Sequence, residues 1–218
     1  MLQSAQPPLA DSASRVDPAD LRWRLRGATA AAHETLDRRF ETLADPGDTR
    51  AYHAFLRMNH ACHALLEAWL APVVGPARDP AGRAAAPAGA VPPRQPLTAA
   101  LAADLAALDL APLPRDGLAD LVTALPQGLS EAAGVLYVLD GSRLGARMIL
   151  KGWARQSKGL PSTVYLTAAA ASSGPVFGAF DALCAHIDPA DVAQTIVAAQ
   201  AAFKLFERAS ALTTQGEA

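Results

Sequence analysis

The apolar positions of this chain recur with the spacing of amphipathic helices. Between residues 18 and 43, apolar-face side chains return every three, four or seven positions: Leu25, Thr29, Leu36, Phe40 and Leu43. That spacing places them along one side of a helix. Asp17 and Pro18 precede the stretch as an N-cap residue and a first-turn proline, and a Pro-Gly turn at residues 45–48 ends it.

A second helix is predicted from about residue 50 to Leu70, with Thr49 as its cap. Its apolar face is Phe55, Met58, Cys62, Leu65 and Trp69. Five further helical stretches are predicted at residues 97–108, 115–125, 130–155, 174–186 and 189–212, the last begun by Asp188-Pro189. No alternation typical of strands and no internal repeat interrupts this pattern. The prediction is an all-α fold of seven or eight helices in a single domain.

Three segments differ in composition. Residues 1–17 are small, polar and Pro-bearing, and we predict a disordered N-terminal tail. Residues 72–96 are rich in Pro, Ala and Gly without periodicity, which predicts a long loop. The helical domain is therefore expected to cover residues 18–213.

Composition and charge remove several classes of function. The chain has 218 residues, 51% of them hydrophobic, and a formal net charge of −2, so it lacks the broad basic footprint of a nucleic-acid-binding protein. No apolar run approaches the roughly 20 residues that span a bilayer. The N-terminus does not have the pattern of a secretory signal. The two cysteines form no CxxC pattern, which argues against structural zinc and is typical of a cytoplasmic protein.

His33 is the first candidate for chemistry. Arg26 lies two turns before it and Asp37 one turn after it on the same side of the helix. A neutral imidazole is a good iron ligand, and Asp37 can accept the proton on the other ring nitrogen. Arg26, roughly 10 Å along the axis, suits a carboxylate at the edge of a ligand. The alternative is a surface row of ion-paired side chains.

Glycines mark the second candidate segment. Gly134, Gly141 and Gly145 share one face of the predicted helix at 130–155, and each costs roughly 1 kcal/mol relative to alanine. Such a helix needs close approach to its backbone, either by another helix or by a flat ligand. The spacing alone leaves both alternatives open.

Together these segments resemble one protein family. Tyr137-Val-Leu-Asp-Gly141-Ser142-Arg-Leu-Gly145 resembles the distal-helix segment of bacterial, biliverdin-producing heme oxygenases, including the type that works with bacteriophytochromes. Leu21-Arg-x-x-Leu-Arg-x-x-Thr29-x-x-x-His33-x-x-Leu-Asp37 resembles the proximal helix of that family. The resemblance extends over about residues 20–212 and includes Phe203 in the closing helix.

The resemblance implies a heme oxygenase-like fold with haem held between the proximal and distal helices. His33 would be the axial iron ligand and Asp37 its hydrogen-bond acceptor. The remaining haem-binding positions implied by the family are Arg26, Thr29, Tyr137, Gly141, Gly145 and Phe203. Gly141, Ser142 and Gly145 would form the catalytic face.

The implied activity is oxidative cleavage of haem to biliverdin, Fe²⁺ and carbon monoxide with O₂ and external electrons. A ferredoxin or a flavoprotein reductase would supply the electrons, and a bacteriophytochrome is a candidate recipient of the biliverdin.

Two positions depart from the family pattern. Ser142 stands where many members carry an aspartate that orders a water, and Asp140, about 200° around the helix, cannot replace it. Residues 174–186 lack the Lys/Arg pair that holds the propionates in some members. The candidates to compensate are Arg143, Arg147 and Lys151. Two alternatives therefore remain, a non-catalytic haem carrier or sensor with this fold, and a helical protein that binds no haem.

The other histidines are expected at the surface. The row His53, His60, His63 and Glu67 lies opposite the Phe55–Trp69 face and is predicted to be exposed to solvent, although His60 and His63 have a workable spacing for a metal. His186 is predicted at the surface near a helix end. The predicted packing residues are Cys62, Cys184, Trp23, Trp69 and Trp153.

Overall fold

The computed structural model describes residues 15–74, 90–155, 161–171 and 175–215, and within these ranges the fold is all-α, as predicted. The helices are α1 (Pro18–Arg39), α2 (Thr49–Val74), α3 (Thr98–Ala107), α4 (Ala119–Thr123), α5 (Leu129–Trp153), α6 (Val164–Ala170), α7 (Gly178–Cys184) and α8 (Val192–Gln215). Short 3₁₀ turns, η1 (Glu41–Ala44) and η2 (Pro189–Asp191), follow α1 and precede α8.

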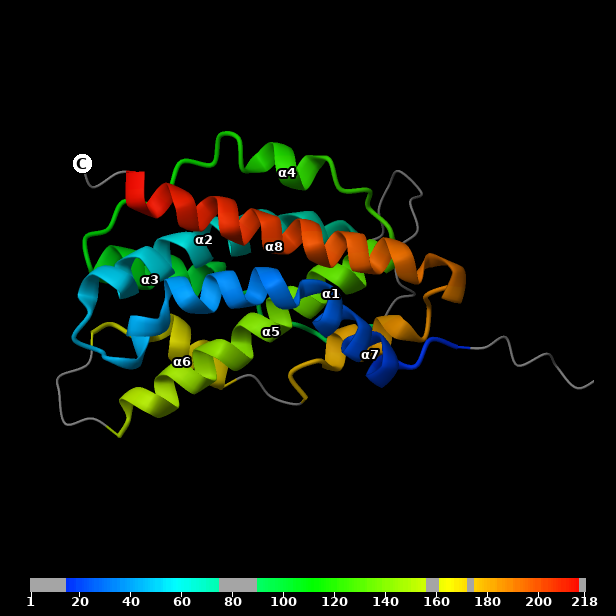
Figure 1. Cartoon of the computed structure of the whole chain (residues 1–218), viewed down its shortest axis with the longest axis horizontal. Helices are drawn as coiled ribbons and strands as arrows, with labels where there is room; N and C mark the ends of the chain where they lie inside the picture. The colour runs from blue at the N-terminus through cyan, green and yellow to red at the C-terminus, as the bar shows by residue number, and fades with distance from the viewer. Residues whose placement is uncertain (1–14, 75–89, 156–160, 172–174, 216–218) are drawn as a thin grey trace, which may run out of the picture.

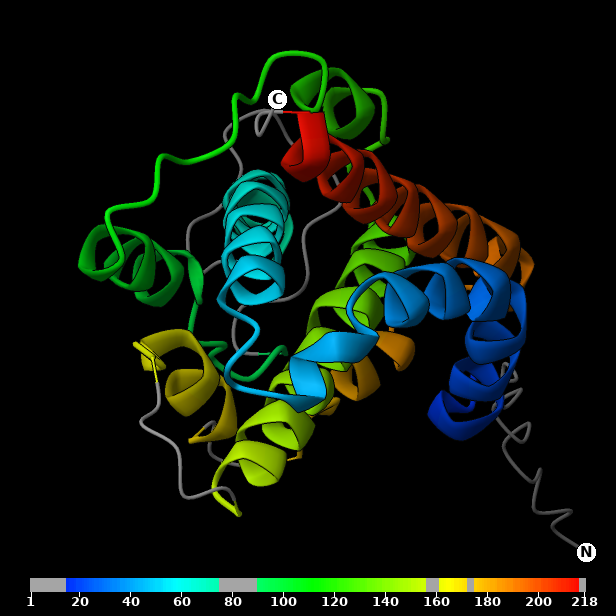
Figure 2. The same ribbon diagram turned by 60° about the vertical axis from the view of Figure 1, so that its left-hand side comes forward.

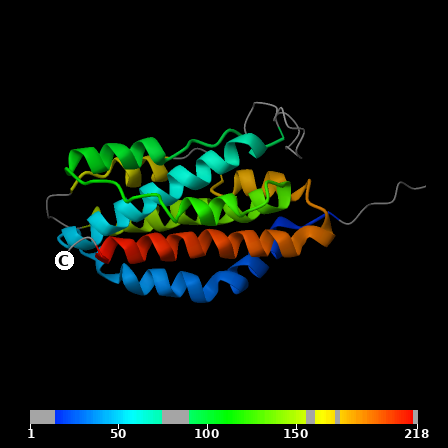
Figure 3. The same ribbon diagram turned by 90° about the horizontal axis from the view of Figure 1, so that it is seen from above.

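Helix α8 packs against α1, α2, α4 and α5 (Figures 1 and 3). Helices α3 and α6 pack against each other and cover α2 and α5 on the other side. Helix α1 packs far more extensively against α8 than against α5, although it crosses in front of α5 in Figure 2. Helices α1 and α5 therefore pack only sparsely against each other.

The helix-start signals are confirmed at two of three positions. The Asp17 side chain accepts a hydrogen bond from Ala19 N at 3.0 Å, and Asp188 accepts one from Ala190 N at 2.8 Å. At the second helix the prediction was wrong by one residue. Thr49 is already helical, and Asp48 is the cap, accepting from Ala51 N at 3.0 Å.

Helix α2 is buried on more than one side, which the single apolar face did not predict. Met58, Cys62 and Trp69 are buried as expected. A second stripe is buried as well: Tyr52, Leu56, Asn59, His63, Leu66, Leu70 and Val73. The prediction that His60 and His63 face solvent was therefore wrong, because α2 is covered by α8 on one side and by α3 and α5 on the other.

Helix α6 was not predicted from the sequence. Its first turn depends on Asp104 in α3, whose carboxylate accepts from Val164 N at 2.9 Å, Tyr165 N at 2.8 Å and the Ser162 hydroxyl at 2.5 Å. A carboxylate at the start of a helix satisfies backbone donors that have no partner within the helix. This support comes from a distant residue, so local periodicity could not indicate it.

Of the five residues predicted to be packing residues, four are buried and one is exposed. Trp69 and Trp153 are buried, and their indole nitrogens donate to Leu125 O and Leu43 O. Cys62 and Cys184 are buried and free. Trp23 contradicts the prediction, because 76% of it is exposed.

Several expected boundaries lie partly outside the described residues. Of the expected tail, only residues 15–17 are described, and of the expected loop at 72–96, α2 takes residues up to Val74 and 75–89 are not described. Helix α5 ends at Trp153, two residues before the expected end at residue 155. His186 is exposed just beyond α7, as predicted. None of the described helices has both the length and the apolar character needed to cross a membrane.

Candidate functional site

A cavity of about 1290 Å³ lies between α1 and α5, and α2 and α8 also contribute to its wall. We call it the α1–α5 cavity. Most of the sequence-predicted site residues line it: Arg26, Thr29, His33, Asp37, Tyr137, Gly141, Ser142, Gly145 and Phe203. Residues more than a hundred positions apart are thus brought to one site. His33 and Asp37 are also exposed and paired with each other, as in the surface row of ion-paired residues given above as the alternative for His33, and both residues border this cavity.

His33 reaches the cavity from α1 with one ring nitrogen already engaged. Its Nδ1 lies 2.8 Å from Asp37 Oδ2, and 63% of its side chain is exposed. The Phe203 ring lies 6.0 Å away, centroid to centroid, and packs beside it. Because Asp37 occupies Nδ1, a ligand in the cavity would meet Nε2. A neutral imidazole held in this way is oriented to bind a metal through Nε2.

The glycines of α5 fall into two groups. A Cβ built on Gly134 would overlap the carbonyl oxygen of Thr195 and lie 2.9 Å from Ala199 N, both in α8. A Cβ built on Gly141, Gly145 or Gly152 would meet nothing within 4 Å. Gly134 therefore serves helix packing, whereas no neighbouring helix explains Gly141 and Gly145, which face the cavity.

Cationic and hydroxyl groups gather at one end of the cavity. Arg22, Arg26, Thr29 and Tyr137 line this end. Burial raises the pKa of Tyr137, and the hydrogen bond with Thr29 and the charge of Arg26 act in the opposite direction. The Tyr137 ring also stacks on Phe177, with centroids 5.8 Å apart and planes at 20°. This end can bind an anionic group such as a carboxylate.

Arg22 is held by the segment that lacks the expected Lys/Arg pair. It forms an ion pair with Asp181 of α7, and its guanidinium lies 5.6 Å from the centroid of the Phe177 ring. Its place on the line Arg22, Arg26, Thr29, His33, spaced four, three and four, was a signal that the sequence analysis missed.

The three cations considered as substitutes do not line the cavity. Arg143 is 3% exposed and donates to the carbonyl oxygen of Gln95, behind α5. Arg147 and Lys151 are also absent from the wall, although Arg155 contributes to it. The suggestion that Arg143 compensates for the missing pair was therefore wrong.

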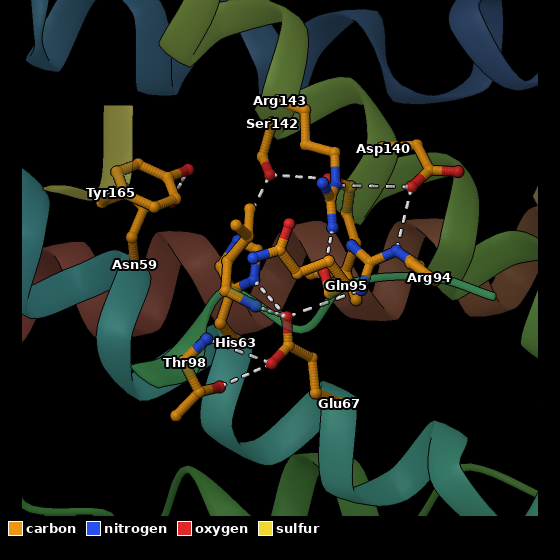
Figure 4. Close-up of polar contacts among 12 residues, drawn as sticks. Asn59, His63, Glu67, Arg94, Gln95, Thr98, Asp140, Ser142, Arg143 and Tyr165 are labelled. Atoms are coloured by element: carbon orange, nitrogen blue, oxygen red, sulfur yellow. Dashed lines mark hydrogen bonds and ion pairs between the residues drawn. The ribbon is translucent and has the colours of Figure 1, made fainter. Parts of the chain in front are cut away.

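Ser142 connects the cavity to a buried polar chain that we call the Ser142–His63–Glu67 chain (Figure 4). Ser142 Oγ lies 3.3 Å from His63 Nε2, and His63 Nδ1 lies 2.9 Å from Glu67 Oε1. The His63 side chain is fully buried, and that of Glu67 is 9% exposed. Glu67 also accepts hydrogen bonds from Leu97 N at 2.9 Å and from the Thr98 hydroxyl at 2.7 Å.

The protonation states in this chain follow from burial and hydrogen bonding. Burial lowers the pKa of His63, although Glu67 favours the charged ring. Burial raises the pKa of Glu67, but the hydrogen bonds from His63, Leu97 and Thr98 outweigh it and hold this pKa at about 2. At neutral pH the pair is thus a carboxylate and a neutral imidazole, with Nδ1–H donating to Glu67 and the Nε2 lone pair facing Ser142.

Asp140 lies on the other side of α5. Its carboxylate accepts from Arg94 Nε at 3.0 Å and lies 3.9 Å from Arg143 Nε. Burial raises its pKa, against the charge of Arg94. Asp140 does not line the cavity, which agrees with the prediction that it cannot replace the aspartate missing at position 142. Its role is to fasten the segment around Arg94 to α5.

His63 and Glu67 are the residues of this site that sequence reasoning missed. The signal was available, because His63 belongs to the stripe Tyr52, Leu56, Asn59, His63, Leu66, spaced four, three, four and three. A polar residue within such a stripe faces the core, and Glu67 one turn later provides its partner. Among the described residues no group of three or more His, Cys, Asp or Glu side chains is arranged to hold a metal ion.

Comparison of the chain with protein-family models, with curated proteins and with solved structures found no match.

Proposed function

We propose that this protein is a heme oxygenase that binds haem in the α1–α5 cavity and cleaves it to biliverdin, Fe²⁺ and carbon monoxide. The observation that carries the proposal is the opposition of His33 on α1 to the open glycines Gly141 and Gly145 on α5 across one cavity. Glycines that no helix covers cost stability without helping packing. A flat ligand lying against the backbone at these positions would explain why they are glycine.

The cavity fits such a ligand in chemistry as well as in shape. One end offers Arg22, Arg26 and Tyr137 for carboxylates, which a haem carries as propionates. Apolar side chains line much of the remaining wall: Leu36, Phe40, Val138, Leu144, Met148, Phe203 and Phe206. This division between a charged end and an apolar body matches an amphipathic macrocycle.

Each residue would then have a defined task. His33 Nε2 would bind the iron, and Asp37 would keep the ring oriented through Nδ1. Arg26 and Tyr137 would seat the propionates. Gly141 and Gly145 would let the backbone of α5 approach the other face, where a side chain would block access to the iron. The haem supplies the oxygen chemistry, and the protein supplies ligation, orientation and access.

The proposed reaction needs an external electron donor, for which a ferredoxin or a flavoprotein reductase is suitable. Trp23 and Met148 at the rim of the cavity are 76% and 71% exposed, and such apolar rim residues are common where a partner docks. A cytoplasmic location follows from these partners. Biliverdin leaving the site would be available to a bacteriophytochrome.

A haem carrier or sensor with the same fold is the second candidate. It is favoured by Ser142 in place of an aspartate and by Asp181 on α7, where a cation would help to hold a propionate. Such a protein would bind haem through His33 without turning it over.

Titration with hemin followed by addition of reductant tests both proposals. We expect the wild type and the control variant His53→Ala to develop a Soret band, and His33→Ala to lose it. On addition of ascorbate or a reductase, the Soret band should decay and a biliverdin band should appear. A stable Soret band after reduction would favour the carrier, and no Soret band in the wild type would reject both.

A further inference from the structure

Ser142 is the one member of the Ser142–His63–Glu67 chain that lines the α1–α5 cavity. His63 and Glu67 lie behind it, in α2, and neither borders the cavity. The Glu67 carboxylate, which also lies 3.5 Å from Arg94 Nη1, is thus connected to the cavity wall through a buried ring and a hydroxyl group. Glu67 is kept ionised there by donors from His63, Leu97 and Thr98.

The order of residues matches that of a Ser-His-carboxylate nucleophile, but Ser142 lies in the middle of α5. Its own amide and the following ones are engaged in the hydrogen bonds of the helix. A nucleophilic serine needs unengaged donors beside it for the oxyanion. The chain is therefore unsuited to covalent catalysis, and its effect must be exerted through the hydroxyl group itself.

The direction of the hydrogen bonds defines that effect. Nδ1–H of His63 donates to Glu67, so Nε2 accepts, and the Ser142 hydroxyl has two acceptors in reach, Nε2 at 3.3 Å and Leu139 O at 2.7 Å. Tyr165 of α6 also lies beside Ser142, and its own hydroxyl donates to Asn59 Oδ1 at 3.4 Å. With its proton directed into the protein, the oxygen turns lone-pair density toward the cavity. Successive hydrogen bonds polarise one another in a low-dielectric interior.

We propose that His63 and Glu67 act through Ser142 as positioning residues, giving its oxygen part of the acceptor strength of a carboxylate toward a water molecule or ligand group in the cavity. This inference rests on the proposed function, because a polarised water beside Gly141 is useful where bound oxygen must receive protons. In this proposal Glu67 on α2 takes over the role of ordering a water, which the aspartate has in family members that carry it at the position of Ser142. No proton needs to leave His63 or Glu67.

Turnover of the hemin-loaded protein tests the inference by loss and rescue. We expect Ser142→Ala and His63→Gln to bind hemin as the wild type does and to lose about 10-fold to 100-fold in the rate of haem cleavage. The double variant His63→Gln/Ser142→Asp should recover the rate that His63→Gln loses, because the new carboxylate no longer needs the ring behind it.

His60→Gln is the matched control, since His60 is a buried histidine one turn earlier on α2 that does not line the cavity. It should keep the wild-type rate. The inference is overturned if His63→Gln turns over normally, or if Ser142→Asp fails to rescue a double variant that folds and binds hemin.

A second measurement needs neither hemin nor turnover, and so separates this inference from the proposed function. ¹⁵N spectra of the protein alone at pH 7 should show His63 protonated at Nδ1, with an Nε2 resonance that moves in Ser142→Ala while that of His60 stays. A His63 ring protonated at Nε2, or an Nε2 resonance indifferent to Ser142, would overturn the inference. Failure to bind hemin with the expected spectra would instead reject the proposed function alone.

Discussion

Gly134 and Gly141 lie two turns apart on the same helix, yet their surroundings are opposite. At Gly134 the backbone of α8 comes so close that a Cβ would overlap Thr195 O, whereas at Gly141 a Cβ would meet nothing. Both cost helix stability relative to alanine. At Gly134 tight packing offsets this cost, and at Gly141 nothing in the protein itself does. Because packing within the protein does not explain Gly141, we take this glycine as support for a bound ligand beside α5.

The same contrast separates the two sides of α5. The side toward α8, α2 and the segment at residues 90–97 is buried and filled by apolar packing and by the pairs of Asp140 and Arg143. The side toward α1 carries three open glycines and exposed Met148. We call these the packed side and the open side. Ser142 is where they meet, since it lines the cavity and contacts His63 behind it.

Replacing Gly134 by alanine tests the packed side and should have the largest effect. The added methyl must push α5 away from α8, because the atoms it meets are backbone. We expect a loss of about 3 kcal/mol in the free energy of unfolding, at the upper end of overpacking costs. Urea denaturation followed by circular dichroism measures this. An unchanged unfolding midpoint would contradict the close approach of α8.

Gly141→Leu tests the open side by filling it. The side chain would occupy the space beside α5 where the proposed ligand lies, so turnover should fall by about 100-fold, or about 2.7 kcal/mol in activation free energy, and much more than hemin affinity. Hemin titration and the rate of Soret decay give the two numbers. Normal turnover in this variant would remove Gly141 from the proposed catalytic face.

Lowering the pH should reduce the free energy of unfolding in two steps, through His63 and then Glu67 behind the packed side. The pKa of His63 is lower in the folded protein than its ordinary value of 6.5, so the unfolded chain binds more protons and stability falls as the pH drops below about 6.5. Glu67 has an ordinary pKa of 4.5 and about 2 when folded, so its contribution is complete above 4.5 and falls by about 1 kcal/mol by pH 4.

Urea unfolding at pH 7, 5.5 and 4 measures both steps. In His63→Gln the decrease between pH 7 and 5.5 should shrink, because the ring that titrates is gone. An equal decrease in the variant and the wild type over that interval would show that His63 is not the group responsible.

Gly141→Ala should have the smallest effect and the opposite sign to Gly134→Ala. Its methyl group meets no atom within 4 Å, so the higher helix propensity of alanine should raise the free energy of unfolding by about 0.5 to 1 kcal/mol. Paired urea titrations of Gly134→Ala and Gly141→Ala are matched for residue type and helix. Destabilisation by both variants would show that the open side is closed in solution.

Much of this arrangement could be predicted from local sequence, because the signals lay within one helix. Asp17 and Asp188 start their helices as expected, since a cap acts on the amides next to it. The His33–Asp37 pair needed only the four-residue repeat. These contacts do not depend on how the helices pack.

What failed depended on contacts between helices. His63 was expected in solvent because one stripe of α2 was taken as its only buried face, and the covering helices α3, α5 and α8 come from distant residues. Trp23 was predicted to be a packing residue, but it is exposed and lines the cavity. The glycine spacing could not distinguish Gly134 from Gly141, since only the position of α8 does so.

A crystal structure of the protein with hemin bound would test the central claim most directly, since that claim is geometric. We predict that the iron is bound by His33 Nε2 and that the opposite face of the ring lies against the backbone of Gly141 and Gly145, with the propionates at the end formed by Arg22, Arg26 and Tyr137. Iron bound by another histidine, or hemin seated outside the α1–α5 cavity, would contradict the account.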